Sequence, residues 1–95
     1  MLIEKGFGTG DVVSLKLVNG DEIIARYEEE TFDSIKISKP LAITLGPQGL
    51  GMIPWMFLGS KDSYTLNKNH VFAMVASKEE AAKQYMEGTT GIALQ

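Results

Sequence analysis

The sequence predicts an all-β domain that curls into a small barrel and ends in a C-terminal helix. Three observations predict this class: a strand-turn-strand pattern around Asn19-Gly20, several short apolar runs separated by turn residues, and a helix-start pattern at Ser77. The connections are mostly short, and small all-β chains remove exposed strand edges by curling into a barrel. We therefore expect five or six strands followed by one helix.

The hairpin over residues 13–27 is the clearest local signal. Apolar and polar residues alternate before Asn19-Gly20, a dipeptide that favours a tight turn because both residues tolerate a positive φ. A two-residue loop would place Leu17 opposite Glu22. A three-residue loop instead places six apolar side chains on one face, namely Val13, Leu15, Leu17, Ile23, Ala25 and Tyr27. Because burial selects the register, we expect the three-residue loop, with Gly20 or its neighbour in the left-handed region.

The middle of the chain leaves two questions open. Residues 28–30 are three glutamates, which we interpret as a solvated turn at the end of the second strand. Residues 32–45 alternate again around Pro40, which cannot donate a ladder hydrogen bond, so they form one long bent strand or two short ones. Residues 46–52 contain three glycines and a proline. They predict a loop, either a plain surface excursion or a mobile binding loop.

Two later strands, over residues 53–58 and 70–76, are apolar on both faces. Two-sided burial is difficult within so small a subunit, so we expect these strands at a contact between copies of the chain. A role for Trp55 as a stacking platform for a ligand is the less favoured alternative. The side chains expected at the subunit interface are Trp55, Met56, Phe57, Leu58, Val71, Phe72 and Met74.

The remaining elements are shorter. Residues 64–66 predict a strand and residues 67–69 a polar turn. Ser77 and Glu80 have the spacing of a capping box that begins a helix. The apolar face of this helix comprises Ala81, Ala82, Tyr85 and Met86. The expected organisation is a flexible N-terminal segment (1–10), a β-barrel (11–77), a helix (78–88) and a tail (89–95).

Composition excludes several functional classes. The 95 residues contain no cysteine, so no disulfide or thiolate site is possible, and His70 is the single histidine. The formal net charge of −3 weighs against a dedicated duplex-DNA binder. We expect no enzyme, catalytic residue, metal site or cofactor. The absence of a long apolar run and of a signal-peptide pattern predicts a soluble, cytoplasmic protein without a membrane partner.

Two segments resemble the motifs of the Sm-like (LSm/Hfq-like) family. Residues 13–20, Val-Ser-Leu-Lys-Leu-Val-Asn-Gly, followed by Ile23 and Ala25, resemble the first Sm motif, and Phe32-Asp33 resembles its end. Residues 67–71, Asn-Lys-Asn-His-Val, leading to residues 74–77, resemble the second motif, in which a polar turn precedes the last strand. The resemblance covers roughly residues 11–77.

The resemblance implies a fold, an assembly and a partner. The fold is a strongly bent five-stranded barrel of the SH3-like type. The assembly is a homo-oligomeric ring in which the fourth strand of one subunit pairs with the fifth strand of the next. The partner is single-stranded RNA, bound at the pore without catalysis where the loops that end the two motifs meet. The matching positions are Phe32, Asp33, Asn67, Lys68, Asn69 and His70.

The chain also departs from the family pattern. Ala25 stands where the family carries a glycine in the bent second strand. The RNA-binding Asp-x-x-x-Asn pattern is not reproduced after Asp33, and the Ile-Arg-Gly signature of the second motif is missing. The predicted helix follows the last strand, whereas the family helix precedes the first. Two functions therefore stay open: an RNA-binding ring, or a ring that serves as a protein-interaction scaffold and has lost RNA binding.

Overall fold

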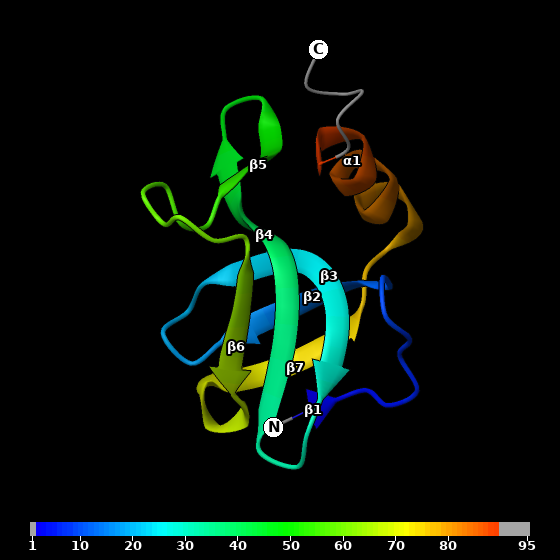
Figure 1. Ribbon diagram of the computed structural model, residues 1–95. Helices are drawn as coiled ribbons and strands as arrows, with labels where there is room; N and C mark the ends of the chain where they lie inside the picture. Colours follow the sequence, from blue (N-terminus) through cyan, green and yellow to red (C-terminus); the bar gives the residue numbers. More distant parts are fainter. Residues whose placement is uncertain (1, 90–95) are drawn as a thin grey trace.

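The computed structural model describes residues 2–89 and is mostly β-structure with one C-terminal helix (Figure 1). This confirms the predicted all-β class with a C-terminal helix. Beyond Thr89, the predicted tail lies outside the described residues. The elements are β1 (Leu2–Ile3), β2 (Val12–Leu17), β3 (Glu22–Glu30), β4 (Ser34–Gly46), β5 (Gly49–Pro54), β6 (Ser63–Asn67), the 3-10 turn η1 (Lys68–His70), β7 (Val71–Ala76) and α1 (Glu79–Thr89).

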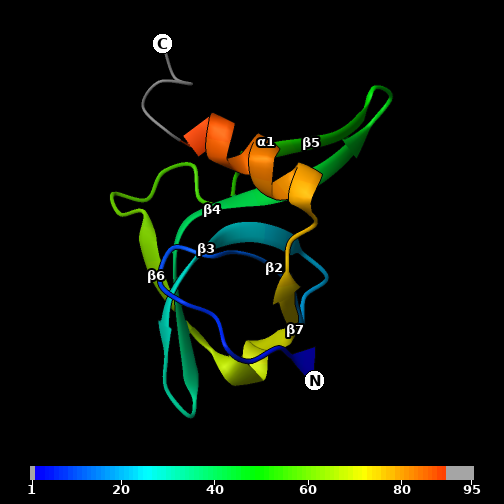
Figure 2. The ribbon, with the colours of Figure 1, turned by 90° about the vertical axis from the view of Figure 1, so that its right-hand side faces the viewer.

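The strands form one curved sheet in the order β1-β7-β2-β3-β4-β5, and β6 also pairs with β4 (Figures 1 and 2). The turn η1 connects β6 to β7. Within residues 2–89, however, β6 pairs with β4 alone, and β7 pairs with β2 and β1. No hydrogen-bonded ladder joins β6 to β7, so the sheet is not closed into a barrel.

The β2–β3 hairpin has the predicted three-residue register. Leu15 lies opposite Ile23, and the Leu17 amide donates to the Asp21 carbonyl at 2.8 Å. Gly20 has a φ of 99° and donates its amide to the Leu17 carbonyl at 2.9 Å. Both predictions for this turn are therefore confirmed.

The core lies on the concave side of the hairpin and includes its whole predicted apolar face. Its buried members are each at most 7% exposed: Val13, Leu15, Leu17, Ile23, Ala25, Tyr27, Ile35, Ile37, Val71 and Met74. Burial of a large apolar side chain stabilises a fold by about 1.5–3 kcal/mol, which explains why burial decides the register.

β4 is one continuous strand that bends at Lys39-Pro40. Lys39 has a φ of 50°, the one positive φ at a non-glycine position among the described residues. Its amide donates to the Asp62 carbonyl at 2.6 Å, and its carbonyl accepts a hydrogen bond from the Tyr85 hydroxyl at 2.7 Å. Before the bend β4 pairs with β6, and after it β4 pairs with β5. Of the two alternatives for residues 32–45, the single bent strand is correct.

Residues 41–54 form a two-stranded arm that extends away from the rest of the sheet (Figures 1 and 2). The predicted loop over 46–52 is wrong, because Gly49 begins β5 and only Pro47 and Gln48 form the turn. The predicted strand over 53–58 is wrong as well, since β5 ends at Pro54. The alternation of apolar and polar side chains does not reveal β5, because glycines, which have no side chain, occupy alternate positions of this strand.

The N-terminal residues contain a strand that the sequence analysis does not predict. β1 lies parallel to β7, with Leu2 beside Ala73 and Ile3 beside Met74. The Glu4 amide then donates to the Met74 carbonyl at 2.9 Å. A two-residue strand has too little pattern to be detected from periodicity.

The helix α1 lies beside the arm (Figure 2). Its predicted apolar face is its less exposed side, since Tyr85 is buried and Ala81, Ala82 and Met86 are half-buried. Tyr85 is fully buried, and burial raises the pKa of its hydroxyl to about 12. The predicted capping box is wrong, because α1 begins at Glu79 and Lys78, not Ser77, is the residue before it. The Ser77 hydroxyl instead hydrogen-bonds to the Ser14 hydroxyl at 2.7 Å. A contact between side chains 63 positions apart is invisible to a local capping rule.

Replacement of Gly20 by Ala tests the turn. An added Cβ meets nothing within 4 Å, so the cost comes from the positive φ alone. We expect Gly20→Ala to lower the free energy of unfolding by about 1 kcal/mol, measured by urea denaturation. Gly8→Ala is the control, because Gly8 has no positive φ. Equal losses in both variants would contradict this account of the turn.

Candidate nucleic-acid interface

Two turns that are far apart in sequence meet at one end of the sheet. The turn over residues 31–33 joins β3 to β4, and η1 joins β6 to β7. Ser34 pairs with Asn67, and the Lys68 amide donates to the Asp33 carbonyl at 2.9 Å. The fold thus brings together the six positions predicted for RNA: Phe32, Asp33, Asn67, Lys68, Asn69 and His70. We call these two turns the turn cluster.

The first turn is held by its own polar side chains. The Thr31 hydroxyl donates to the Asp33 carboxylate at 2.9 Å and accepts from the Ser34 amide at 3.1 Å. These contacts occupy Asp33 within the turn. They also leave Phe32 with no place in the core, and its side chain is 92% exposed. An exposed aromatic ring on a tightly held turn is a preorganised stacking surface.

The second turn is fixed in a similar way. The Asn67 side-chain oxygen accepts from the Asn69 amide at 2.8 Å, so Asn67 is a cap of η1. The His70 carbonyl accepts from the Val18 amide at 3.0 Å, which ties η1 to the β2–β3 turn. The side chains of Asn69 and His70 are exposed. They can therefore offer amide and imidazole groups to a ligand.

Lys68 has a structural partner that the sequence analysis misses. Its ammonium lies 2.7 Å from the Glu30 carboxylate, and the two side chains are only 13% and 17% exposed. Glu30 also accepts from the Tyr27 hydroxyl at 3.0 Å. The contact with Lys68 holds the pKa of Glu30 below its ordinary value of 4.5. The charge of Lys68 is therefore largely compensated within the chain.

The glutamate run is correspondingly not a solvated turn. Residues 28–30 belong to β3, and Glu28 accepts a hydrogen bond from the Ser38 hydroxyl at 2.5 Å. The pairing of β3 with β4 shifts register between Tyr27 and Glu29, so simple alternation does not describe this run. Glu30 lies opposite the buried Ile35 on the core side, whereas Glu28 bonds to Ser38 and Glu29 is exposed. The sequence therefore offers no simple period that separates the exposed glutamate from its two partnered neighbours.

The residues predicted for a subunit interface divide into three groups. Val71 and Met74 are buried in the core of the single chain, so their side chains cannot contact another copy. Trp55 is half-buried and packs edge-on against Tyr64 at a centroid distance of 5.7 Å. The remaining four are exposed: Met56, Phe57, Leu58 and Phe72.

The described part of the chain contains no group of three or more His, Cys, Asp or Glu side chains placed to hold a metal ion. None of its helices has the length and apolar character needed to cross a membrane. At the turn cluster, the geometry offers stacking on Phe32 and hydrogen bonding by Asn69 and His70.

No family model matches the chain, and no curated protein matches it either.

Replacement of Lys68 by Met tests the ion pair. It leaves a mostly buried carboxylate without its cation, so we expect a loss of stability on the order of 3 kcal/mol at pH 7. The double variant Lys68→Met/Glu30→Gln removes both charges and recovers part of that loss. Urea denaturation of the wild type and the variants measures the coupling between the two side chains.

The same pair sets a pH dependence. Because the pKa of Glu30 is lowered in the folded state, its contribution to stability is complete above pH 4.5 and is lost as the pH falls through the lower folded value. The difference between wild type and Glu30→Gln should therefore shrink below pH 4.5. A difference that stays constant down to pH 3 would contradict the ion pair.

Proposed function

We propose that this chain is a divergent, non-catalytic Sm-like module that assembles into a ring and binds single-stranded RNA at the turn cluster. The observation that carries the proposal is the backbone hydrogen bond between Lys68 and Asp33. It joins the two segments that resemble the ends of the Sm motifs. An exposed aromatic ring and two exposed polar side chains accompany that contact.

The strand order also supports an Sm-like architecture. The path β7-β2-β3-β4-β6 contains five strands, with the Asn19-Gly20 hairpin at its centre. β3 and β4 both bend, as two register shifts between them indicate. The turn η1 then leads from the strand at one end of this path to the strand at the other. A bent five-stranded barrel is the fold that such a path favours.

RNA binding at this cluster would depend on stacking and hydrogen bonding. Single-stranded RNA is recognised through unstacked bases, which lie against aromatic rings and form hydrogen bonds along their edges. Phe32 supplies the ring, and Asn69 and His70 supply the polar groups. Since Lys68 is already paired with Glu30, phosphate contacts contribute little. We therefore expect affinity to fall only gently with salt.

Ring assembly would use the free edges of β6 and β7. The β6 edge opposite β4 is open in the described structure. The β7 edge is partly occupied, because β1 pairs with Ala73 and Met74. In a ring, β1 must therefore leave β7 before a neighbouring β6 can pair along its full length. An exchange of one strand for another conserves the backbone hydrogen bonds.

Phe32→Ala tests RNA binding. Loss of one stacked base should weaken binding to poly(A) or poly(U) RNA by about 1–3 kcal/mol, which is a factor of about 5 to 150. Fluorescence anisotropy at low salt measures the affinity. Phe57→Ala is the matched control, because Phe57 is also exposed but lies outside the turn cluster and outside β6 and β7. Equal binding by wild type and Phe32→Ala would exclude stacking on this ring.

Removal of residues 2–5 tests the ring. The shortened chain presents the whole β7 edge, so it should assemble at a concentration roughly tenfold lower than the full chain. Release of two strand residues costs an energy on the order of 1–2 kcal/mol, which corresponds to that factor. Light scattering across a dilution series measures the mass. If the full chain and the shortened chain both remain monomeric at every concentration, assembly through this edge is contradicted.

A protein-interaction scaffold is the second candidate. The pairing of Lys68 with Glu30, together with a net charge of −3, favours a polypeptide partner over a polyanion. If the chain is such a scaffold, the wild type should bind neither poly(A) nor poly(U) RNA at low salt.

A further inference from the structure

Residues 40–60 form a 21-residue stretch without a charged side chain, bounded by Lys39 and Lys61. The nine basic and twelve acidic residues of the chain all lie elsewhere. In the structure this stretch comprises the arm and the segment that returns to β6. A long uncharged stretch is ordinarily buried, yet this one lies on an extension of the fold.

Much of this stretch is exposed. Ten large apolar side chains are exposed among residues 2–89, and six of them fall within these 21 residues. The six are Leu45, Leu50, Ile53, Met56, Phe57 and Leu58. Scattered exposed apolar residues are normal, but a concentration of them marks a surface that another molecule covers.

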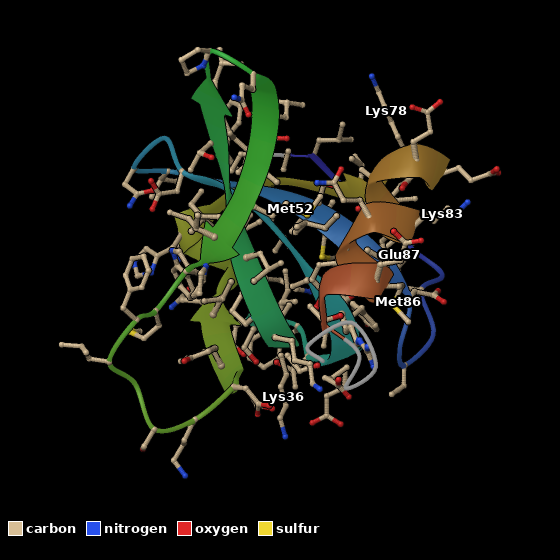
Figure 3. All side chains as sticks on the ribbon, turned by 90° about the horizontal axis from the view of Figure 1, so that it is seen from above. Lys36, Met52, Lys78, Lys83, Met86 and Glu87 are labelled. Carbon is tan, nitrogen blue, oxygen red and sulfur yellow. The ribbon has the colours of Figure 1, made fainter. Side chains whose placement is uncertain are left out.

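One face of the arm is apolar along its length. Ile43 pairs with Met52 and Leu45 pairs with Leu50, so the four side chains share a face. This face borders a groove of about 480 Å³ between the arm and α1. The groove is lined by Ile43, Leu50 and Met52 of the arm and also by the charged residues Glu22, Lys78 and Glu80. Figure 3 shows Met52 on the side of the arm that faces the helix. The outer pair is largely exposed, with Leu45 at 82% and Leu50 at 72%.

The outer edge of the arm is also unprotected. Within the described structure, β5 pairs with β4 alone, and their register contains no shift. Proteins usually protect an exposed edge strand with charged side chains, a bulge or a covering segment. β5 has no charge and no bulge, so its edge is suited to a contact.

We propose that the arm is a self-association surface on which the arms of two copies pack together across a twofold axis. Leu45 and Leu50 of each copy then pack against the apolar face of the other arm. A twofold contact needs a patch that complements itself, and the arm supplies an apolar face beside the open β5 edge, both of which a second copy also offers.

A second copy is the occupant that the arm fits, because it offers the same apolar face and the same open β5 edge. Each chain has a net charge of −3, so contacts between copies are opposed wherever acidic side chains meet. Residues 41–54 of the arm carry no charge, so two arms can meet without that repulsion. This contact is separate from the turn cluster and from the β6 and β7 edges, and it does not depend on RNA binding.

Leu50→Lys tests the arm, with size-exclusion chromatography and light scattering over a dilution series as the measurement. The wild type should have at least twice the mass of the variant at the same concentration. Leu45→Lys should have the same effect from the opposite strand. Val18→Lys is the control, because Val18 is exposed but lies in the β2–β3 turn. Circular dichroism and thermal melting show whether each variant is folded.

An unchanged mass in folded Leu50→Lys and Leu45→Lys would overturn the inference, as would an equal loss of mass in Val18→Lys. The shortened chain lacking residues 2–5 separates this contact from the ring. Assembly that responds to the truncation but not to the lysines would support the ring and overturn the arm contact. The reverse pattern would support the arm contact alone.

Discussion

The bend of β4 at Lys39 is the constraint on which the other features depend. A positive φ at a lysine is unfavourable, and the structure holds it through two backbone contacts, one from the Lys39 amide to Asp62 and one from the Tyr85 hydroxyl to the Lys39 carbonyl. The bend ends the pairing with β6 and begins the pairing with β5. It therefore separates a body, which contains the core and the turn cluster, from an arm that projects beyond it. The helix is anchored at the same point through Tyr85.

The fold was predictable where a strong local rule and burial agreed. The Asn19-Gly20 dipeptide predicted a hairpin. Burial of the apolar side chains from Val13 to Tyr27 was possible in only one register, and the structure confirms that register. Prediction failed where the deciding contact was distant. Ser77 hydrogen-bonds to Ser14 across 63 positions, and β1 depends on β7, which is about 70 residues away. It also failed over residues 46–58, where glycines conceal the alternation that identifies β5.

The candidate site was likewise predictable from the sequence only in part. Resemblance to two short motifs located the six positions of the turn cluster, and the register of β4 with β6 brings them together. The resemblance did not predict the state of Lys68, because its partner Glu30 lies in a run of three acidic residues that is ordinarily solvated. Because that pair is mostly buried, the proposed recognition depends on stacking and hydrogen bonding and not on phosphate contacts. A motif identifies which side chains are near a ligand, whereas their neighbours in the fold decide what charge those side chains present.

The pairing of β1 with β7 has a consequence for the order of folding. Residues 2 and 3 are synthesised about 70 residues before their partners at 73 and 74. Contacts of such large sequence separation form late and slow the folding of small domains. Until β7 is in place, the apolar Leu2 and Ile3 have no strand to join. Once β7 is in place, its edge is available to whichever strand reaches it first, so the local concentration of chains influences which pairing is made.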